Sequence, residues 1–461
     1  MLQCEYIYLI GVGGIGMSSM AQWYRALGKH VFGYDRTPTA ITDYLATKGI
    51  KIVFNTDEQH IPQEIIKNKA ESLIIYTPAI PVEHPLLRYF NRHGYRVCKR
   101  IDVLERITQR YKTVAVAGTH GKTITTALVS HILHQANCHM VAFVGGVVKG
   151  YDANLLMHGS DHEDVMLVIE ADEYDRFFLR LHADICVVTS MDADHLNIYG
   201  DVQQYQEAFR QFVASTPPYG YAVVHEAVAR RIGIHHMPGS RAKYYALEGK
   251  EIRAENVCVD QGLVCFDYVS NAVRIDGIQL PLVGTYNVEN TLAAITTCHR
   301  LGLASGIIRE GIRTFQGVER RFEFIFRDQH TVFISDYAHH PVEITAALRA
   351  ARALYPHKRI TAVFQPHLYS RTRDFAREFA QSLDLADQVC LLAIYPAREE
   401  PIAGVTSELI MDYMQVADKA LCASTEVINQ LTQWGKPEVL MLMGAGDINK
   451  LIDPLKAFLS T

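Results

Sequence analysis

The sequence lacks the features of a membrane protein or of a disulfide-stabilised secreted protein. Its nine cysteines are odd in number, are scattered along the chain and never form a CxxC pair. No apolar run approaches the roughly 18 residues of a membrane span. The short apolar run before Gly11 is too brief for a signal peptide. We therefore expect reduced thiols, no membrane partner and a cytoplasmic location.

A large excess of charge of one sign is also missing. The formal net charge is -5 at pH 7, which argues against a nucleic acid or an anionic membrane and favours small phosphate-bearing partners. The chain contains no internal repeat and no low-complexity tract. Its 461 residues, of which 49% are apolar, suit a globular protein of about three domains.

The most informative stretch covers residues 113–126, Thr-Val-Ala-Val-Ala-Gly-Thr-His-Gly-Lys-Thr-Ile-Thr-Thr. Its apolar, β-branched start predicts a buried strand, Gly118–Gly121 a tight turn, and Thr123 the first turn of a helix. Unpaired backbone N–H groups and the positive end of the helix dipole make such a turn an anion site. The pattern therefore predicts a phosphate-binding loop.

Two side chains of this loop add to the prediction. Lys122 supplies a positive charge, and Thr123 supplies a hydroxyl suited to Mg²⁺. The usual Walker A pattern would need glycine at position 116, where this chain has Val116. The loop is thus the shorter Gly-x-x-Gly-Lys-Thr, and the alternative is a glycine turn whose lysine faces solvent.

The N-terminal residues predict a second anion site. Residues 5–10 indicate a strand, Gly11–Gly16 carries the GxGxxG pattern, and a helix follows to about Leu27. A strand over 31–35 ends in Asp35 and completes a βαβ unit. This is the NAD fingerprint, but a UDP-linked substrate presents the same diphosphate to the same turn.

Acidic turns follow two predicted strands of the central region. Glu170–Asp175 follows a strand over 165–169, and Met191–His195 follows a strand over 185–190. Carboxylates and an imidazole at strand ends beside a phosphate loop could hold Mg²⁺ on a nucleotide. A solvated acidic loop and a structural His195 are the alternatives.

The rest of the chain predicts more α/β structure. Short strands between 243 and 275 precede a helix that starts near Asn287 and Asn290, which could either read a base edge or cap the helix. The polar stretch 105–112 is interpreted as a linker. Strands and helices then alternate as a third doubly wound domain over 331–335, 341–354, 359–365, 371–384, 388–394, 438–443 and 447–459. The turns 335–341 and 365–373 of this domain carry histidines and arginines suited to anions.

Taken together, these motifs resemble the Mur ligase family along nearly the whole chain. Six strings occur in that family's order: Gly-Thr-His-Gly-Lys-Thr (118–123), Glu-Ala-Asp-Glu (170–173), Asp-Ala-Asp-His (192–195), Asn287-x-x-Asn290, Arg320-Arg-Phe and Asp336-Tyr-Ala-His-His-Pro. The glycine turn through Ser18 and the string Gln-Pro-His-Leu-Tyr-Ser-Arg-Thr-Arg (365–373) are similar to the branch that adds L-alanine.

The resemblance implies three α/β domains and an ATP-dependent, amide-forming reaction. Residues 1–106 would form a Rossmann-like UDP-sugar domain. Residues 107–318 would form a P-loop ATPase-like domain with a mostly parallel sheet and a small antiparallel portion, and 319–461 a Rossmann-like domain that receives the amino acid. ATP with Mg²⁺ would phosphorylate the lactyl carboxylate of UDP-N-acetylmuramate, and L-alanine would attack the acyl phosphate. We expect a monomer or a weak homodimer.

Roles for individual residues follow from the same resemblance. Lys122 would hold the ATP phosphates within the loop Gly118, Thr119, His120, Gly121, Thr123 and Thr125. Thr123 and Glu170 would bind one Mg²⁺ and His195 a second. Asn287 and Asn290 would serve the adenine side, Arg320 the phosphates, and Asp336 the ribose or a neighbouring loop. His339 with Arg371 or Arg373 would face the amino acid and the transferring phosphoryl group. The UDP-sugar would contact Gly13, Gly14, Ile15, Gly16, Ser18 and Asp35.

Some positions depart from the family pattern. Tyr286 stands where the family usually has His, Leu368 where many members have Arg, and Asn197 where Asp is common. Later ligases of the family use a carbamylated lysine soon after the metal histidine, yet no lysine occurs between 195 and 242. Its absence favours the alanine-adding branch.

Three other functions compete with this interpretation. A recycling ligase that attaches a whole tripeptide to the same sugar nucleotide shares much of the first two domains. An NAD-dependent oxidoreductase would explain the first glycine turn and Asp35 alone. A nucleotide-binding module without hydrolysis would bind ATP and release no phosphate.

Overall fold

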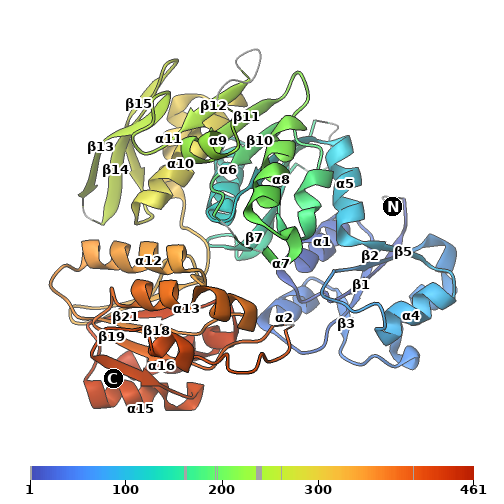
Figure 1. Ribbon diagram of the computed structural model, residues 1–461. Helices are drawn as coiled ribbons and strands as arrows, with labels where there is room; N and C mark the ends of the chain where they lie inside the picture. The colour runs from blue at the N-terminus through green and yellow to red at the C-terminus, as the bar shows by residue number, and fades with distance from the viewer. Residues whose placement is uncertain are drawn as a thin grey trace. The chain divides into compact units, whose positions relative to one another are not determined.

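The computed structural model describes residues 3–159, 164–192, 194, 196–234, 241–260, 262–397 and 399–460. The chain forms two compact units. The first comprises Met1–Asn256, Phe266–Ile278 and Glu289–Gln316, and the second Val257–Cys265, Gln279–Val288 and Gly317–Thr461. Three β-sheets flanked by helices confirm the predicted α/β class (Figure 1).

The N-terminal sheet is fully parallel, with strand order β3-β2-β1-β4-β5. Its strands are β1 (Tyr6–Ile10), β2 (His30–Tyr34), β3 (Lys51–Val53), β4 (Ser72–Tyr76) and β5 (Arg96–Lys99). Its helices are α1 (Ile15–Ala26), α2 (Ala40–Thr47), α3 (Gln63–Lys67), α4 (Pro85–Arg92) and α5 (Arg100–Arg110). The strand order reverses between β1 and β4, and such a switch point opens a ligand crevice at the carboxyl end of β1.

The prediction of a linker over 105–112 is wrong, because this stretch forms the end of α5 and the start of β6. Ile101, Leu104, Ile107 and Thr108 are buried. Ile101, Leu104 and Ile107 follow one another at intervals of three, and Thr108 lies four positions after Leu104, so all four share one face of a helix. The many charged residues between them conceal this stripe in the sequence.

The central sheet has the order β15-β14-β13-β12-β11-β10-β6-β9-β7-β8. Its strands are β6 (Lys112–Ala117), β7 (Met140–Val148), β8 (Ala153–His158), β9 (Met166–Glu170), β10 (Ile185–Val188), β11 (Tyr221–His225), β12 (Ala242–Tyr245), β13 (Ile252–Asp260), β14 (Leu263–Ser270) and β15 (Arg274–Leu280). β6 lies between β9 and β10 and is parallel to both. The turns that follow these three strands therefore meet at one edge of the sheet.

Six α-helices belong to the same part of the chain among the residues described there. They are α6 (Lys122–Gln135), α7 (Leu196–Tyr199), α8 (Val202–Ala214), α9 (Glu226–Arg231), α10 (Thr285–Arg300) and α11 (Ser305–Thr314). α6 begins directly after the glycine turn, and most of its side chains from Thr123 to Leu133 are buried. The strand, turn and helix predicted over 113–126 are thus confirmed.

The third sheet has the order β16-β17-β21-β18-β19-β20, with only β16 antiparallel to its neighbour among the described pairs. Its strands are β16 (Glu323–Arg327), β17 (Val332–Asp336), β18 (Ile360–Phe364), β19 (Gln388–Leu391), β20 (Asp418–Leu421) and β21 (Val439–Met443). Its helices are α12 (Pro341–Leu354), α13 (Tyr369–Leu383), α14 (Glu408–Met411), α15 (Val427–Trp434) and α16 (Ile452–Ser460).

Two apolar clusters cover the two faces of this third sheet. Val439, Met441 and Met443 of β21 belong to one cluster, whereas Leu440 and Leu442 belong to the other. Alternate side chains of a strand point to opposite faces, so a strand buried on both faces is apolar throughout. This explains why the sequence predicts β21 correctly although it shows no polar alternation.

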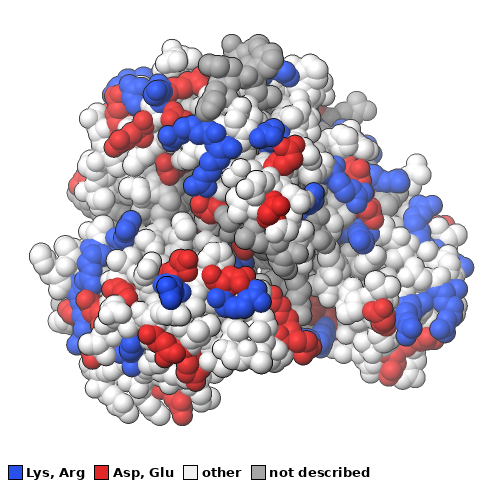
Figure 2. Space-filling view, viewed as in Figure 1, with Lys and Arg blue, Asp and Glu red and all other residues white. Residues whose placement is uncertain are grey.

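No helix among the described residues is long and apolar enough to cross a membrane. On the face shown in Figure 2, basic and acidic side chains are interspersed.

Candidate active site

The glycine turn after β6 is held open by two glycines that tolerate no side chain. Gly118 has φ +138° and Gly121, the N-cap of α6, has φ +82°. A Cβ on Gly118 would lie 2.2 Å from Thr189 Oγ1 and 2.8 Å from the backbone nitrogen of Ser190. A Cβ on Gly121 would lie 2.3 Å from Asn290 Oδ1. Asn290, which was predicted to serve the adenine side, therefore lies directly beside the N-terminus of α6.

The polar side chains of the turn anchor it to the neighbouring strand end. Thr119 Oγ1 donates to the Asp192 carbonyl at 2.7 Å and shares a 2.8 Å hydrogen bond with the Tyr205 hydroxyl. The His120 N–H donates to Ser190 Oγ at 2.7 Å, and its ring lies 3.6 Å from an Asp192 carboxylate oxygen. These side chains fix the loop, which leaves its backbone to face an anion. The predicted Thr125 is buried, and its hydroxyl has no hydrogen-bond partner among the residues that the structure describes.

Lys122 is held inside the loop by an acidic partner. Its Nζ lies 2.8 Å and 3.1 Å from the two carboxylate oxygens of Glu173 and also donates to the Gly118 carbonyl. Burial lowers the pKa of Lys122, but the carboxylates of Glu173, Asp172 and Glu170 outweigh it and raise that pKa to about 12. Lys122 therefore stays protonated, and its positive charge lies beside the phosphate loop.

Glu173 was not predicted as a site residue, although it belongs to the acidic motif that was. Burial raises its pKa to about 7 despite the opposing pull of Lys122. The Tyr199 hydroxyl donates to the Glu173 carbonyl and helps to fix its place. In the sequence, Glu173 was marked only as the fourth residue of the Glu-Ala-Asp-Glu motif.

Thr123 and Glu170 lie together, as a shared metal ion would require. Thr123 Oγ1 lies 3.1 Å from Glu170 Oε1, and Gly145 N donates to the other carboxylate oxygen at 2.8 Å. A hydroxyl and a carboxylate are oxygen ligands of the kind that Mg²⁺ prefers, with phosphates and water completing its shell. These two residues therefore fit the predicted ion. No cluster of three His, Cys, Asp or Glu side chains suited to a metal occurs among the described residues, and His195 lies outside them.

The N-terminal glycine turn is organised by Asp35. Gly13 N donates to Asp35 Oδ2 at 2.7 Å, and Arg36 N donates to the other oxygen at the same distance. Gly14 is the N-cap of α1, and Ile15 is the first helical residue. The backbone N–H groups at this helix start are therefore available to a diphosphate.

The predicted substrate residue Ser18 is fully buried. Its hydroxyl donates to the Ile15 carbonyl at 2.9 Å and accepts from Asn154 Nδ2 at 3.0 Å. Asn154 belongs to β8, so Ser18 joins the first helix to the central sheet within the first unit. Its role in binding the sugar nucleotide stays a prediction from the resemblance alone.

In the second unit, the predicted nucleotide residues make local contacts. Asp336 accepts hydrogen bonds from Phe322 N and Ala338 N, both at 2.7 Å, and burial raises its pKa to about 6. It thus holds the neighbouring loop, one of its two predicted roles. Arg320 has φ +57° and donates to the carbonyls of Gly444 and Gly446.

Asn287, the other residue predicted for the adenine side, and its neighbour Tyr286 lie in the first turn of α10. Asn287 is buried and donates to the Val283 carbonyl at 2.7 Å. Tyr286, which replaces the usual histidine, has its ring packed against Gly284, where a Cβ would lie 2.5 Å from a ring carbon. Burial raises the pKa of the Tyr286 hydroxyl, which therefore remains neutral.

The structure separates the two arginines that the sequence left as alternatives. Arg371 is buried, and its Nη1 lies 3.4 Å from His367 Nδ1. The ring of His367 lies 5.9 Å from that of His339, and His339 Nδ1 lies 3.1 Å from a Glu343 oxygen. Arg373 is exposed and pairs with Asp374 at 2.7 Å. Only Arg371 belongs to the cluster with His339.

We predict a clear difference between alanine substitutions at these two arginines. Arg371→Ala should lower the turnover of the ATP-dependent reaction that the resemblance implies at least tenfold, because a charge-assisted contact is worth about 1.5–3 kcal/mol. Arg373→Ala removes the same charge from the same helix and should leave turnover within about twofold. Steady-state phosphate release measures both. Equal losses in the two variants would contradict the assignment of Arg371.

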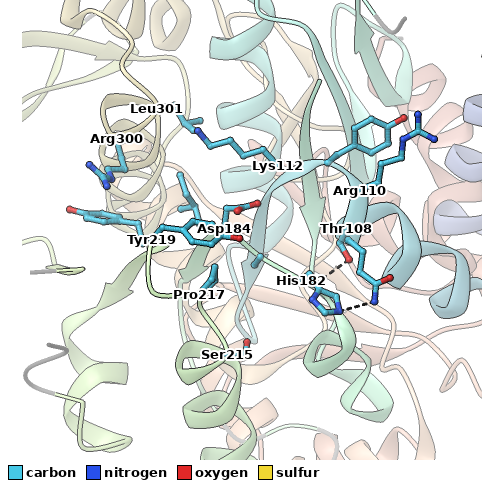
Figure 3. A pocket seen from close by; sticks show the side chains of 15 residues that line it. Thr108, Arg110, Lys112, His182, Asp184, Ser215, Pro217, Tyr219, Arg300 and Leu301 are labelled. Atoms are coloured by element: carbon cyan, nitrogen blue, oxygen red, sulfur yellow. Dashed lines mark hydrogen bonds between the residues drawn. The ribbon is translucent and has the colours of Figure 1, made fainter. Parts of the chain in front are cut away.

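A separate cleft of about 830 Å³ lies at the opposite edge of the central sheet (Figure 3). It is lined by the residues that begin β6, β10 and β11, whereas the phosphate loop follows the end of β6. Arg110 and Arg300 line it from the last turns of α5 and α10, where a cation offsets the helix dipole. This cleft is therefore distinct from the phosphate site.

Comparison with known proteins identifies the architecture. The chain matches the model of the Mur ligase family, catalytic domain, over residues 6–112, of the Mur ligase middle domain over 116–298, and of the Mur ligase, glutamate ligase domain over 320–446. It is 42% identical to the UDP-N-acetylmuramate--L-alanine ligase of Phocaeicola vulgatus across 98% of both chains. The chain belongs to the Mur ligase family.

Other relatives agree with this assignment. The UDP-N-acetylmuramate--L-alanine ligase of Porphyromonas gingivalis is 40% identical across 99% of both chains. The crystal structure of UDP-N-acetylmuramate-alanine ligase MurC from Thermotoga maritima matches with a TM-score of 0.82, 25% identity and 99% coverage of both chains. A murein peptide ligase from Psychrobacter arcticus shares the fold with a TM-score of 0.70 and 22% identity. Family membership removes the oxidoreductase alternative, and these matches do not favour the tripeptide ligase.

Proposed function

We propose that this protein is an ATP-dependent ligase that joins L-alanine to the lactyl carboxylate of UDP-N-acetylmuramate in peptidoglycan precursor synthesis. The observation that carries this proposal is the 42% identity over 98% of both chains with a ligase of that name. The phosphate loop and the protonated Lys122 beside it support the use of ATP in the proposed reaction. A relative, MurF of Thermotoga maritima, has been crystallised with ADP.

The reaction needs positioning and charge neutralisation more than covalent chemistry by the protein. The loop backbone and Lys122 hold the phosphates of ATP and stabilise the charge that develops as the γ-phosphoryl group moves to the lactyl carboxylate. Thr123 and Glu170 would hold Mg²⁺, which when bound offsets phosphate charge. His195 would hold a second ion.

The second half of the reaction is attack on the acyl phosphate by the amine of L-alanine. We assign the residues near His339 and Arg371 to the amino acid and the transferring phosphoryl group, and Asn287, Asn290 and Arg320 to the nucleotide. Domain boundaries at 106/107 and 318/319 are part of the same proposal, as are a cytoplasmic location and a monomer or weak homodimer. The boundary at 106/107 falls within α5.

We predict that phosphate release from ATP and Mg²⁺ requires both UDP-N-acetylmuramate and L-alanine. The acyl phosphate forms only on the sugar nucleotide, and turnover continues only when an amine consumes it. The assay compares no amino acid, L-alanine and the L-Ala-γ-D-Glu-diaminopimelate tripeptide. Release with the tripeptide alone would support the recycling ligase, and no release in any mixture would contradict the proposed function.

A further inference from the structure

Arg100, the first residue of α5, lies where two anion-handling regions of the first unit meet. β5 and β1 belong to the same parallel sheet, so the start of α5 and the glycine turn after β1 share one edge of that sheet. The guanidinium of Arg100 packs directly on Gly16, where a Cβ would lie 2.3 Å from Nη1 and 2.8 Å from Cζ. Any side chain at position 16 would displace it.

The acids of the central sheet also act on this guanidinium. Burial lowers the pKa of Arg100, and the carboxylates of Asp172 and Glu170 oppose this shift. Glu170 is also the partner of Thr123 in the proposed Mg²⁺ site. Arg100 therefore contacts the glycine turn of the first sheet and also interacts electrostatically with the acids beside the phosphate loop of the second.

The hydrogen-bonding capacity of Arg100 is largely unused by the protein. Its guanidinium carries five N–H donors, yet its one hydrogen bond within the described residues is a long 3.5 Å contact from Nη1 to the Gly16 carbonyl. It forms no ion pair with a described carboxylate, and its side chain remains partly exposed. A half-buried cation that donates no hydrogen bond to a described anion is costly, and a planar fork of donors matches a carboxylate or phosphate.

We propose that Arg100 binds an anionic oxygen pair of the sugar nucleotide, at the junction of the glycine turn and the Glu170 edge. The inference rests on the proposed function for the identity of that ligand. Two groups of the ligand share the required chemistry: the diphosphate, held at the start of α1, and the lactyl carboxylate, presented to the γ-phosphoryl group. In either case Arg100 is a substrate-binding residue.

The test compares Arg100→Gln and Arg100→Lys with wild type and with Arg106→Gln. Arg106 is an exposed arginine of the same helix, so its variant controls for the loss of one charge in α5. Calorimetry measures binding of UDP and of UDP-N-acetylmuramate, and phosphate release gives kcat and the KM of each substrate. We expect Arg100→Gln to weaken the reaction with the sugar nucleotide ten- to hundredfold, the range for one charge-assisted pair.

The two possible groups give different patterns. Loss of the diphosphate contact should weaken binding of UDP itself and raise the KM of the sugar nucleotide with kcat retained. Loss of the carboxylate contact should leave UDP binding unchanged and lower kcat. Arg100→Lys keeps the positive charge but lacks the planar fork of donors, so its activity and affinity should be intermediate between those of wild type and Arg100→Gln. This second variant keeps the test usable if the glutamine variant does not fold.

The outcome that overturns this inference is distinct from failure of the proposed function. If wild type is active and both folded Arg100 variants match Arg106→Gln within about twofold in kcat, KM and UDP affinity, Arg100 does not bind the substrate. If wild type releases no phosphate in any mixture and binds neither UDP nor the sugar nucleotide, the proposed function fails, and the inference about Arg100 fails with it.

Discussion

Lys122→Met should lower turnover by about 10²–10³, the loss typical when one preorganised charge-stabilising group is removed. Methionine keeps the length of the side chain but carries no positive charge to offset the negative charge of the phosphoryl group during its transfer. Because the missing interaction acts mainly in the transition state, kcat should fall more than the KM of ATP rises. Initial rates of phosphate release at saturating UDP-N-acetylmuramate and L-alanine measure the effect.

Because Lys122 forms a buried ion pair, its substitution also affects folding stability. A second substitution separates this effect from the loss of turnover. Lys122→Met leaves Glu173 buried without its partner, which is destabilising until that carboxyl takes up a proton. Because burial raises the pKa of Glu173 and the loss of Lys122 removes the charge that opposes this shift, we expect the loss of stability to be smaller at pH 6 than at pH 8. Lys122→Met with Glu173→Gln should recover stability while turnover stays low. Recovery of turnover in this double variant would mean that Lys122 is structural.

A matched control for Lys122 lies at the other end of the same strand. Lys112 begins β6, whereas Lys122 follows the turn after it. Lys112→Met removes the same charge from the edge of the sheet that faces away from the phosphate loop. It should leave turnover within about twofold.

The sequence predicted the phosphate loop because several independent signals coincide there. A β-branched run marks the strand, two glycines mark the turn, and Gly-Lys-Thr marks the helix start, which the structure places at Lys122. The resemblance to the Mur ligase family implied that Thr123 and Glu170 share an ion, and the rule that parallel strands share a carboxyl edge agrees with it. The structure confirms this proximity at 3.1 Å.

Other features depend on packing that the sequence does not display. Glu173 is 51 positions from Lys122, and which acid of the turn meets the lysine depends on the path of the backbone after β9. Arg371 and Arg373 are two positions apart on a helix, so they point to nearly opposite sides. Only the packed structure shows which side is buried. The same limit applies to Arg100, whose contact with Gly16 joins two turns far apart in the chain.

Gly118→Ala should lower kcat/KM for ATP about a hundredfold, the second large effect expected from this site. The added methyl would lie 2.2 Å from Thr189 Oγ1, 2.8 Å from Ser190 N and 3.1 Å from Ser190 O. The hydroxyl can rotate away, but the backbone of Ser190 follows Thr189, whose N–H donates to the Ala117 carbonyl of β6 at 3.0 Å, so it cannot move freely. The loop itself must therefore move, and a displacement of about 1 Å at a reacting group costs on the order of 10²-fold. Alanine is also strained at φ +138°.

Steric overlap and backbone strain can be separated with Gly302→Ala. Gly302 has φ +89° and has nothing within 4 Å of the position a Cβ would take. This variant should lose about 1 kcal/mol of folding stability from backbone strain alone and keep the kcat/KM of wild type. Urea unfolding and ATP-dependent phosphate release, measured on both variants, distinguish the two contributions. If Gly118→Ala keeps kcat/KM within threefold of wild type, the close approach of the loop backbone is not what positions the phosphates of ATP.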